Sequence, residues 1–219
     1  MELNLVQTIA LYAIPVIFAI TLHEAAHGYV AKWFGDSTAY ALGRVSLNPL
    51  RHIDPVGTIL VPLLILLASK LLGGSPLLFG WAKPVPVNYH ALRRPKRDMV
   101  WVAAAGPGAN AMMALGWAVA LKFAIVNGMM AGDYFYEIAS AGIFVNIILM
   151  VLNLLPIPPL DGGRIAVGLL PNKLALSFSR IEPYGFPILL LLLVTNLLTV
   201  ILTPMIIVSY QVIGALFQL

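Results

Sequence analysis

Two histidines and a glutamate lie within the five residues His23-Glu24-Ala25-Ala26-His27, inside a long apolar stretch. On an α-helix, residues four apart lie on the same face, so both imidazoles can share one metal ion. Zinc accepts imidazole nitrogens at about 2.0–2.1 Å, and a glutamate beside the pair can deprotonate water. The spacing therefore predicts a zinc site with His23 and His27 as ligands and Glu24 as the general base.

A simpler interpretation is a pair of polar residues that only hydrogen-bond to neighbouring helices. Glu24 counts against it, because an acid well inside an apolar span costs about 2.5–3.5 kcal/mol on insertion scales unless a partner offsets the charge. A metal cation is such a partner. We therefore favour the metal site over the hydrogen-bonded pair.

A tetrahedral catalytic zinc needs a third protein ligand and one open position. The chain has no Cys, so this ligand is a histidine or a carboxylate. Asp161 follows a long uncharged run; three prolines between Asn153 and Asp161 forbid a regular helix there, and two glycines relax the backbone after it. We expect Asp161 to turn toward the histidines rather than to face water at a helix end. The rival ligands, in polar segments, are His52, Asp54 and His90.

The elements that position these residues are predicted to be membrane-spanning helices. Of the 219 residues, 60% are hydrophobic and 10% charged, whereas soluble domains carry about 25% charged residues. Four stretches long enough to span a bilayer lack Asp, Glu, Lys and Arg, namely 3–22, 99–121, 138–160 and 183–219. The runs are continuous, which excludes a transmembrane β-barrel. We predict an all-α, polytopic bundle of about five to six spans, a single membrane-embedded domain over 1–219.

Three segments leave details of this architecture open. The run 55–82 fits a re-entrant hairpin or one span with an extended return. The last 37 residues, 183–219, fit one long helix or two short ones hinged near Thr203-Pro204. The segment 38–50, after the first span, is expected to be a membrane-associated loop or short strands, whose edge could pair with an extended peptide.

The net charge of +4 does not require a nucleic-acid partner, because the basic residues lie in short segments between apolar runs. This is the positive-inside pattern. The segment 83–97 holds five basic residues and no acid, so we place it in the cytoplasm. The lipid bilayer is then the expected environment, with the site toward the cytoplasmic side of the cell membrane.

These motifs resemble those of the site-2 protease family of intramembrane zinc metalloproteases, in its compact branch without PDZ or CBS domains. The family's HExxH motif matches His23, Glu24 and His27, and its N-x-x-P-x-x-x-x-D-G motif matches Asn153, Pro156, Asp161 and Gly162. Two further segments are similar to the family's GRxxLNP and AGP…N elements, Gly43-Arg44-Val45-Ser46-Leu47-Asn48-Pro49 and Ala105-Gly106-Pro107-Gly108-Ala109-Asn110.

The resemblance implies that one zinc ion per chain is bound by His23, His27 and Asp161, with Glu24 as the base. It also places Asn153 near the substrate backbone. Transmembrane segments of other proteins are the implied substrates, cut in regulated intramembrane proteolysis. Asn110 is interpreted as a packing residue without a catalytic role. Two alternatives stay open from the residues alone: a membrane metal-ion transporter and a non-catalytic protein that captures helices.

Overall fold

The computed structural model describes residues 5–52, 54–61, 64 and 83–219, and it contains helices but no strand in these ranges. Four helices are long and apolar enough to cross a membrane, and a bent pair, α7 and α8, makes a fifth candidate span. They are α1 (Leu5–Trp33), α4 (Pro95–Val126), α5 (Tyr134–Asn153), α9 (Leu197–Phe217), and the pair α7 (Asn172–Ser179) with α8 (Glu182–Val194). The all-α, polytopic prediction is confirmed.

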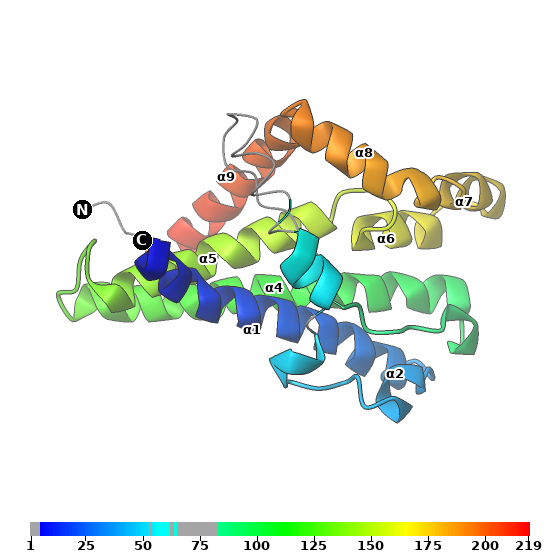
Figure 1. The fold of residues 1–219 in the computed structure, drawn as a ribbon, viewed down its shortest axis with the longest axis horizontal. Coiled ribbons are helices and arrows are strands. Elements are labelled where there is room, and N and C mark those ends of the chain that lie inside the picture. The colour runs from blue at the N-terminus through cyan, green and yellow to red at the C-terminus, as the bar shows by residue number, and fades with distance from the viewer. Residues whose placement is uncertain (1–4, 53, 62–63, 65–82) are drawn as a thin grey trace.

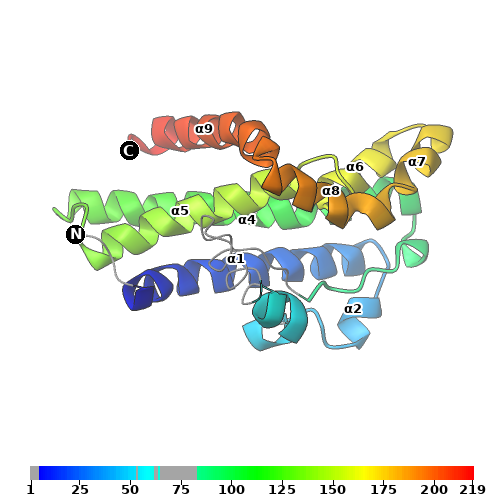
Figure 2. The same ribbon diagram turned by 45° about the horizontal axis from the view of Figure 1, so that its top comes forward.

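Helices α1, α4 and α5 pack side by side and form the core of the bundle (Figures 1 and 2). Their contact faces carry small residues, such as Ala19, Ala118 and Ala139, all completely buried. Without a hydrophobic driving force inside lipid, small side chains let helix backbones approach closely. Gly142 of α5 illustrates this, because the Trp117 indole of α4 fills the space that a side chain there would need.

Helix α9 packs against α5 on the side away from α1, and α8 packs against α9 (Figure 2). The chain breaks between α8 and α9 at Asn196, whose φ of 61° is left-handed, a conformation that Asn adopts more readily than most residues. Of the two possibilities left open for 183–219, the structure has two helices, but the break is not near Thr203-Pro204, since Pro204 lies inside α9. A proline is tolerated there because neighbouring helices and local adjustments satisfy the freed backbone groups of a membrane helix.

The turn from α5 to α6 (Asp161–Leu169) has the non-helical course that its prolines predict. Residues 154–160 separate the end of α5 at Asn153 from the start of α6 at Asp161. A side chain at Gly162 would overlap the backbone carbonyls of Leu154 and Leu155, and one at Gly163 would overlap the backbone at Pro158. The two glycines therefore let α6 fold back tightly against the turn, which fixes the position of Asp161.

The segment after the first span is a loop with short helices rather than strands. It contains α2 (Thr38–Ala41) and the 3-10 turn η1 (Pro49–Arg51), followed by the π-helical turn η2 (Pro55–Leu60). A second 3-10 turn, η3 (Tyr89–Ala91), precedes α4. Most of the open segment 55–82 lies outside the described residues, so the choice between a hairpin and a single span there stays a prediction.

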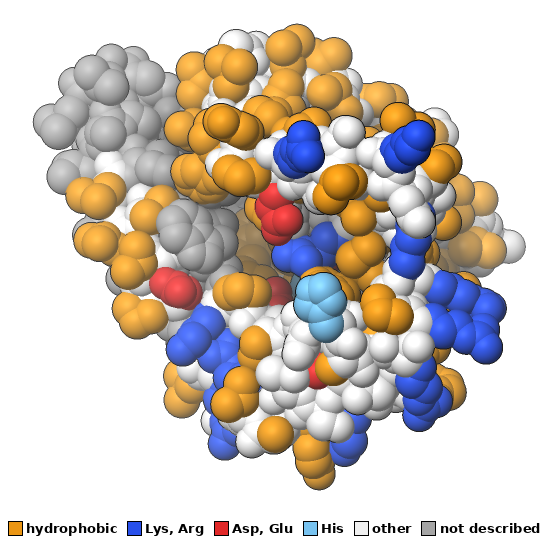
Figure 3. Space-filling view, turned by 90° about the vertical axis from the view of Figure 1, so that its right-hand side faces the viewer, with side chains coloured by type: hydrophobic (Ala, Val, Ile, Leu, Met, Phe, Trp, Pro, Cys, Tyr) orange, Lys and Arg blue, Asp and Glu red, His pale blue; other side chains and the backbone are white. Residues whose placement is uncertain are grey.

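One end of the bundle is strongly basic. At this end α1 finishes, α4 starts, and α6 and α7 lie close by (Figure 1). Lys and Arg side chains are spread across this face (Figure 3). At the opposite end, the connection between α4 and α5 carries Asp133, the first turn of α5 carries Glu137, and neither has a basic residue.

Candidate metal centre

Three side chains from distant parts of the chain converge inside the bundle. His23 and His27 lie one turn apart on α1, and Asp161 is the first residue of α6. The Nε2 atoms of His23 and His27 are 3.1 Å apart. The Oδ2 atom of Asp161 lies 3.2 Å from Nε2 of His23 and 3.4 Å from Nε2 of His27. Within the described residues, this is the one group of three or more such side chains close enough to hold a metal ion.

The hydrogen bonds of the two imidazoles fix which nitrogen carries the proton. The Nδ1 atom of His27 lies 2.7 Å from the backbone carbonyl oxygen of Val102, which can only accept. The Nδ1 atom of His23 lies 2.6 Å from Oδ1 of Asn110. In both rings Nδ1 therefore donates, and the neutral imidazoles present bare Nε2 lone pairs to each other and to Asp161.

The orientation of the Asn110 amide is set by a chain of buried hydrogen bonds. The Nδ2 atom of Asn146 on α5 donates to the carbonyl of Gly142 at 2.8 Å, so Oδ1 of Asn146 is free to accept. Nδ2 of Asn110 donates to that oxygen at 3.0 Å, which leaves Oδ1 of Asn110 for His23. Both asparagines are completely buried. Helices α4 and α5 thus orient a histidine of α1.

This donor set fits a tetrahedral zinc ion. Zinc bonds of about 2.0–2.2 Å at tetrahedral angles put neighbouring ligand atoms about 3.3–3.6 Å apart, close to the three separations of 3.1, 3.2 and 3.4 Å. When both imidazoles are neutral and Asp161 is ionised, three lone-pair atoms at such distances repel one another unless a proton or a metal cation lies between them. The Oδ2 atom of Asp161 is also buried without a hydrogen-bond partner in the described part of the chain. A metal ion satisfies all three atoms.

Gly106 on α4 leaves the space that this group requires. A Cβ atom at this position would lie 2.6 Å from Nε2 of His23 and closer still to Nε2 of His27. Real Cβ atoms do not approach other atoms this closely. The bare backbone of α4 at Gly106 therefore forms one wall of the candidate metal centre.

Glu24 lies next to His23 on α1 and reaches the segment that precedes α4. Its Oε2 atom accepts a hydrogen bond from the backbone N–H of Val85 at 2.8 Å. Arg44 also contacts that segment: its Nη2 donates hydrogen bonds to the carbonyls of Lys83 and Pro84 at 3.1 and 3.3 Å. The arginine of the Gly43-Arg44 element thus helps to present Val85 to the carboxylate of Glu24.

The remaining candidate residues lie outside the cluster. Asn153 ends α5, and its Nδ2 donates to the carbonyl of Leu149 at 2.9 Å within its own helix. Nε2 of His52 lies 2.8 Å from the carbonyl of Ser46, and Asp54 caps η2. His90 is exposed. The three rival ligands of the sequence analysis are therefore not part of the described group.

Charged side chains flank the site on the basic end of the bundle. Arg164, one turn after Asp161, pairs with Glu182 at 3.5 Å, and both side chains are partly exposed. The guanidinium carbon of Arg164 also lies 5.0 Å from the ring centre of Tyr89. Burial raises the pKa of the Tyr89 hydroxyl, and the nearby positive charge of Arg164 opposes this shift.

Sequence reasoning missed the supporting residues of the centre. Asn110 was interpreted as a packing residue, but it is the hydrogen-bond partner of His23; Asn146 and Gly106 complete the same support. The similarity of 105–110 to a family element was the one available signal. This similarity identifies the segment but does not indicate which residues its side chains contact.

Comparisons with known proteins identify the family of this chain. The family model described as peptidase family M50 matches residues 119–195, which include Asn153 and Asp161. YwhC of Bacillus subtilis (strain 168) is 41% identical over 199 residues, which cover 88% of this chain and 84% of that relative. The chain belongs to peptidase family M50. This is the site-2 protease family, so the chain is a zinc metallopeptidase of the site-2 protease type.

A second M50 relative is Rip2 of Mycolicibacterium smegmatis, 32% identical over 180 residues. The match covers 82% of this chain and 64% of Rip2, so the chain spans just under two thirds of that relative's length. The names of YwhC and Rip2 both contain the words zinc metalloprotease. No solved structure matches the chain.

The first prediction tests the wall at Gly106. In Gly106→Ala the new methyl overlaps the imidazole nitrogens, and overpacking of this kind costs about 1–3 kcal/mol, so zinc affinity falls at least about fivefold. Gly108→Ala is the matched control, because nothing lies within 4 Å of a Cβ there on the same helix. Competition with a zinc chelator measures both variants; equal affinity for the two would contradict the assigned wall.

The second prediction concerns the orientation of His23. Asn110→Leu removes the acceptor of the Nδ1 proton while keeping a similar side-chain volume, and we expect zinc affinity to fall about 10- to 100-fold, as is typical for residues that orient metal ligands. Circular dichroism checks that the helices remain. A folded Asn110→Leu protein with the affinity of the wild type would show that Asn110 only packs.

Proposed function

We propose that this M50 peptidase hydrolyses peptide bonds within transmembrane segments of other membrane proteins. The observation that carries the proposal is the depth of the donor cluster. His23 lies nine residues before Lys32 near the end of α1, roughly 13 Å along the helix axis. A peptide bond that meets His23, His27 and Asp161 at this depth belongs to a chain that has itself entered the membrane.

We propose one zinc ion per chain, bound by His23, His27 and Asp161 within a single membrane-embedded domain. When bound, zinc polarises a scissile carbonyl and makes water nucleophilic near neutral pH. The hydrogen bonds of His23 and His27 to Asn110 and Val102 keep both Nε2 lone pairs directed at the ion, because they fix the ring tautomers.

Glu24 is the proposed general base. It follows His23 directly, so its carboxylate starts from the same turn of α1 as the first ligand. The hydrogen bond from the Val85 N–H to Oε2 restricts the orientations that the carboxylate of Glu24 can adopt. Glu24 takes a proton from the attacking water and delivers it to the leaving amine, so that both products leave in stable protonation states.

A substrate helix must unwind before attack, because its carbonyls are hydrogen-bonded within the helix. Asn153 is the proposed partner of the unwound backbone. Its side chain stands at the end of α5, seven residues of turn before Asp161, and is half-buried. An amide that leaves its bond to the Leu149 carbonyl can donate to a substrate carbonyl and stabilise the charge that develops there.

The two alternatives to proteolysis receive less support. A metal-ion transporter needs ligands inside a bundle but no general base, and a helix-capturing protein needs neither. Membership of peptidase family M50 and the presence of Glu24 beside the ligands both favour hydrolysis.

We also propose that the basic end of the bundle faces the cytoplasm and that the chain lies in the cell membrane. Cytoplasmic segments of membrane proteins carry an excess of Lys and Arg. The Lys and Arg side chains on this face, and the acidic connection at the other end, follow that pattern (Figure 3).

The third prediction tests the base. Glu24→Gln keeps both histidines and Asp161 and removes the proton acceptor, so cleavage of single-span membrane substrates in liposomes falls about 10²- to 10⁴-fold at matched zinc content. Glu137→Gln, at the far end of the bundle, is the control and retains activity. Equal cleavage by wild type and Glu24→Gln would contradict the mechanism and favour a contaminating protease or a transporter.

The fourth prediction tests Asn153. Asn153→Ala lowers kcat/KM about 10²- to 10³-fold without changing zinc content, because it removes a donor to the developing charge. Asn127→Ala is a close control: Nδ2 of Asn127 also donates to the carbonyl four residues earlier, at the end of α4. If both variants cleave like the wild type, Asn153 has no role with substrate.

A further inference from the structure

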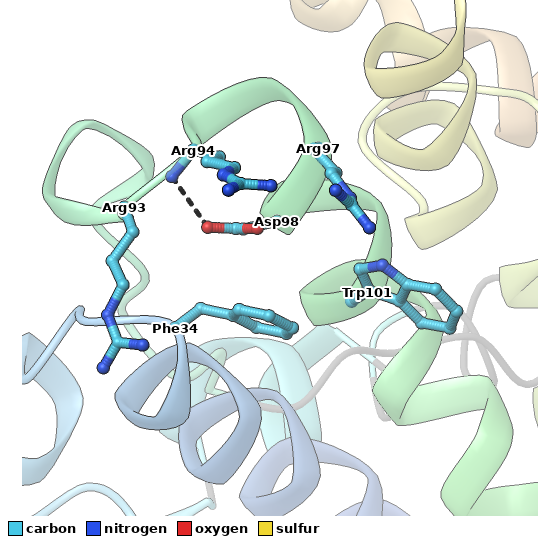
Figure 4. Close-up of a pocket in the computed structure, with 6 residues that line it drawn as sticks. All are labelled: Phe34, Arg93, Arg94, Arg97, Asp98 and Trp101. Atoms are coloured by element: carbon cyan, nitrogen blue, oxygen red, sulfur yellow. Dashed lines mark hydrogen bonds between the residues drawn. The ribbon is translucent and has the colours of Figure 1, made fainter.

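A cavity lined by charged and aromatic side chains lies on the same basic end as the metal centre, but it is built from different residues. It has a volume of about 360 Å³ and lies where α1 ends and α4 begins (Figure 4). Three arginines and one acid line it together with two aromatic rings: Arg93, Arg94, Arg97, Asp98, Phe34 and Trp101. The residues proposed for catalysis do not line this cavity.

The side chains of the three arginines form no polar contact within the described part of the chain. Lys96, between them in sequence, bonds to the carbonyl of Leu170 and to Oδ1 of Asn172 and so ties α4 to α7. The guanidinium groups of Arg93, Arg94 and Arg97, by contrast, form no hydrogen bond or ion pair with the part of the chain that the structure describes. All three residues are exposed.

The one acid in the cavity, Asp98, neutralises only one of the three positive charges. Asp98 is only 4% exposed, and its Oδ2 accepts the backbone N–H of Arg94 at 2.7 Å, which caps the start of α4 (Figure 4). Three guanidinium charges and one carboxylate leave a net charge of +2 around the cavity. The vacant donors therefore favour an anion.

The place of the cavity along α4 identifies the kind of anion. This candidate span begins at Pro95, so residues 93–97 lie where the helix leaves the hydrocarbon. The Trp101 side chain is 58% exposed, and tryptophan is enriched at the level of lipid headgroups. Arginine binds phosphate through paired N–H donors, and near a span end it reaches the headgroup region.

We propose that this cavity binds the phosphate of an anionic phospholipid headgroup, with Arg94 and Arg97 as its main donors and the Trp101 ring against the lipid's upper chain. A zwitterionic lipid has the same phosphate but adds a positive group, which a cavity of charge +2 disfavours. Trp101 precedes Val102, whose carbonyl accepts the hydrogen bond from His27. A bound lipid therefore lies close to this contact between α1 and α4.

The test is a titration of the full-length, delipidated protein in detergent, read by native mass spectrometry. Phosphatidylglycerol and phosphatidylcholine with identical acyl chains are the two probes. We expect the wild type to bind phosphatidylglycerol at least tenfold more tightly than phosphatidylcholine. Equal binding of the two lipids would overturn the proposal.

Two variants with the same loss of charge separate a site from general surface attraction. Arg94→Gln/Arg97→Gln should weaken phosphatidylglycerol binding about 30-fold, since each basic residue near a membrane surface contributes about 1 kcal/mol to the attraction of anionic lipids. Lys173→Gln/Arg180→Gln, whose residues do not line the cavity, should weaken it less than threefold. An equal effect of both pairs would overturn the assignment. If the first pair does not fold, the single variant Arg97→Gln should weaken binding about fivefold.

A soluble phosphate ester distinguishes the source of the phosphate. Glycerol 3-phosphate at the same concentration should leave phosphatidylglycerol binding unchanged, because it lacks the chains that pack on Trp101 and the bilayer side of α4. Competition at equal concentration would show a site for a soluble phosphate and contradict the lipid assignment. Retained zinc content in all variants shows that the metal centre is intact and that the result is independent of the proposed proteolysis.

Discussion

The close approach of three buried side-chain atoms that can bind a metal is the constraint that the surrounding helices must satisfy. Nε2 of His23, Nε2 of His27 and Oδ2 of Asp161 lie within 3.4 Å of one another in a buried space. A low-polarity interior makes such an arrangement unfavourable without a cation. The helices must therefore hold the three groups in place and also leave room between them. Gly106 leaves that room, and buried hydrogen bonds hold the rings.

Each core helix contributes one part of this support. Helix α1 carries the two histidines, α4 contributes Asn110 and the Val102 carbonyl, and α5 orients Asn110 through Asn146. The carboxylate comes from outside the core, and the tight turn at Gly162 fixes its position. Loss of packing at any of these contacts would displace one of the three side chains.

Much of the site could be predicted because its signals are local. The four-residue spacing of His23 and His27 follows from helix geometry, and the prolines and glycines around Asp161 reveal a break at a span end. The role of Asn110 could not be predicted, because it depends on the packing of α4 against α1, 87 residues away in sequence. The helix break at Asn196 was missed because proline is a stronger local signal than asparagine, although a membrane helix tolerates proline.

The proposal that His23, His27 and Asp161 bind one zinc ion is tested most directly by anomalous scattering at the zinc edge from a crystal of the zinc-loaded protein. We expect a single peak per chain about 2.0–2.2 Å from Nε2 of His23, Nε2 of His27 and an oxygen of Asp161. A peak held by His52 or His90, or one that excludes Asp161, would contradict it.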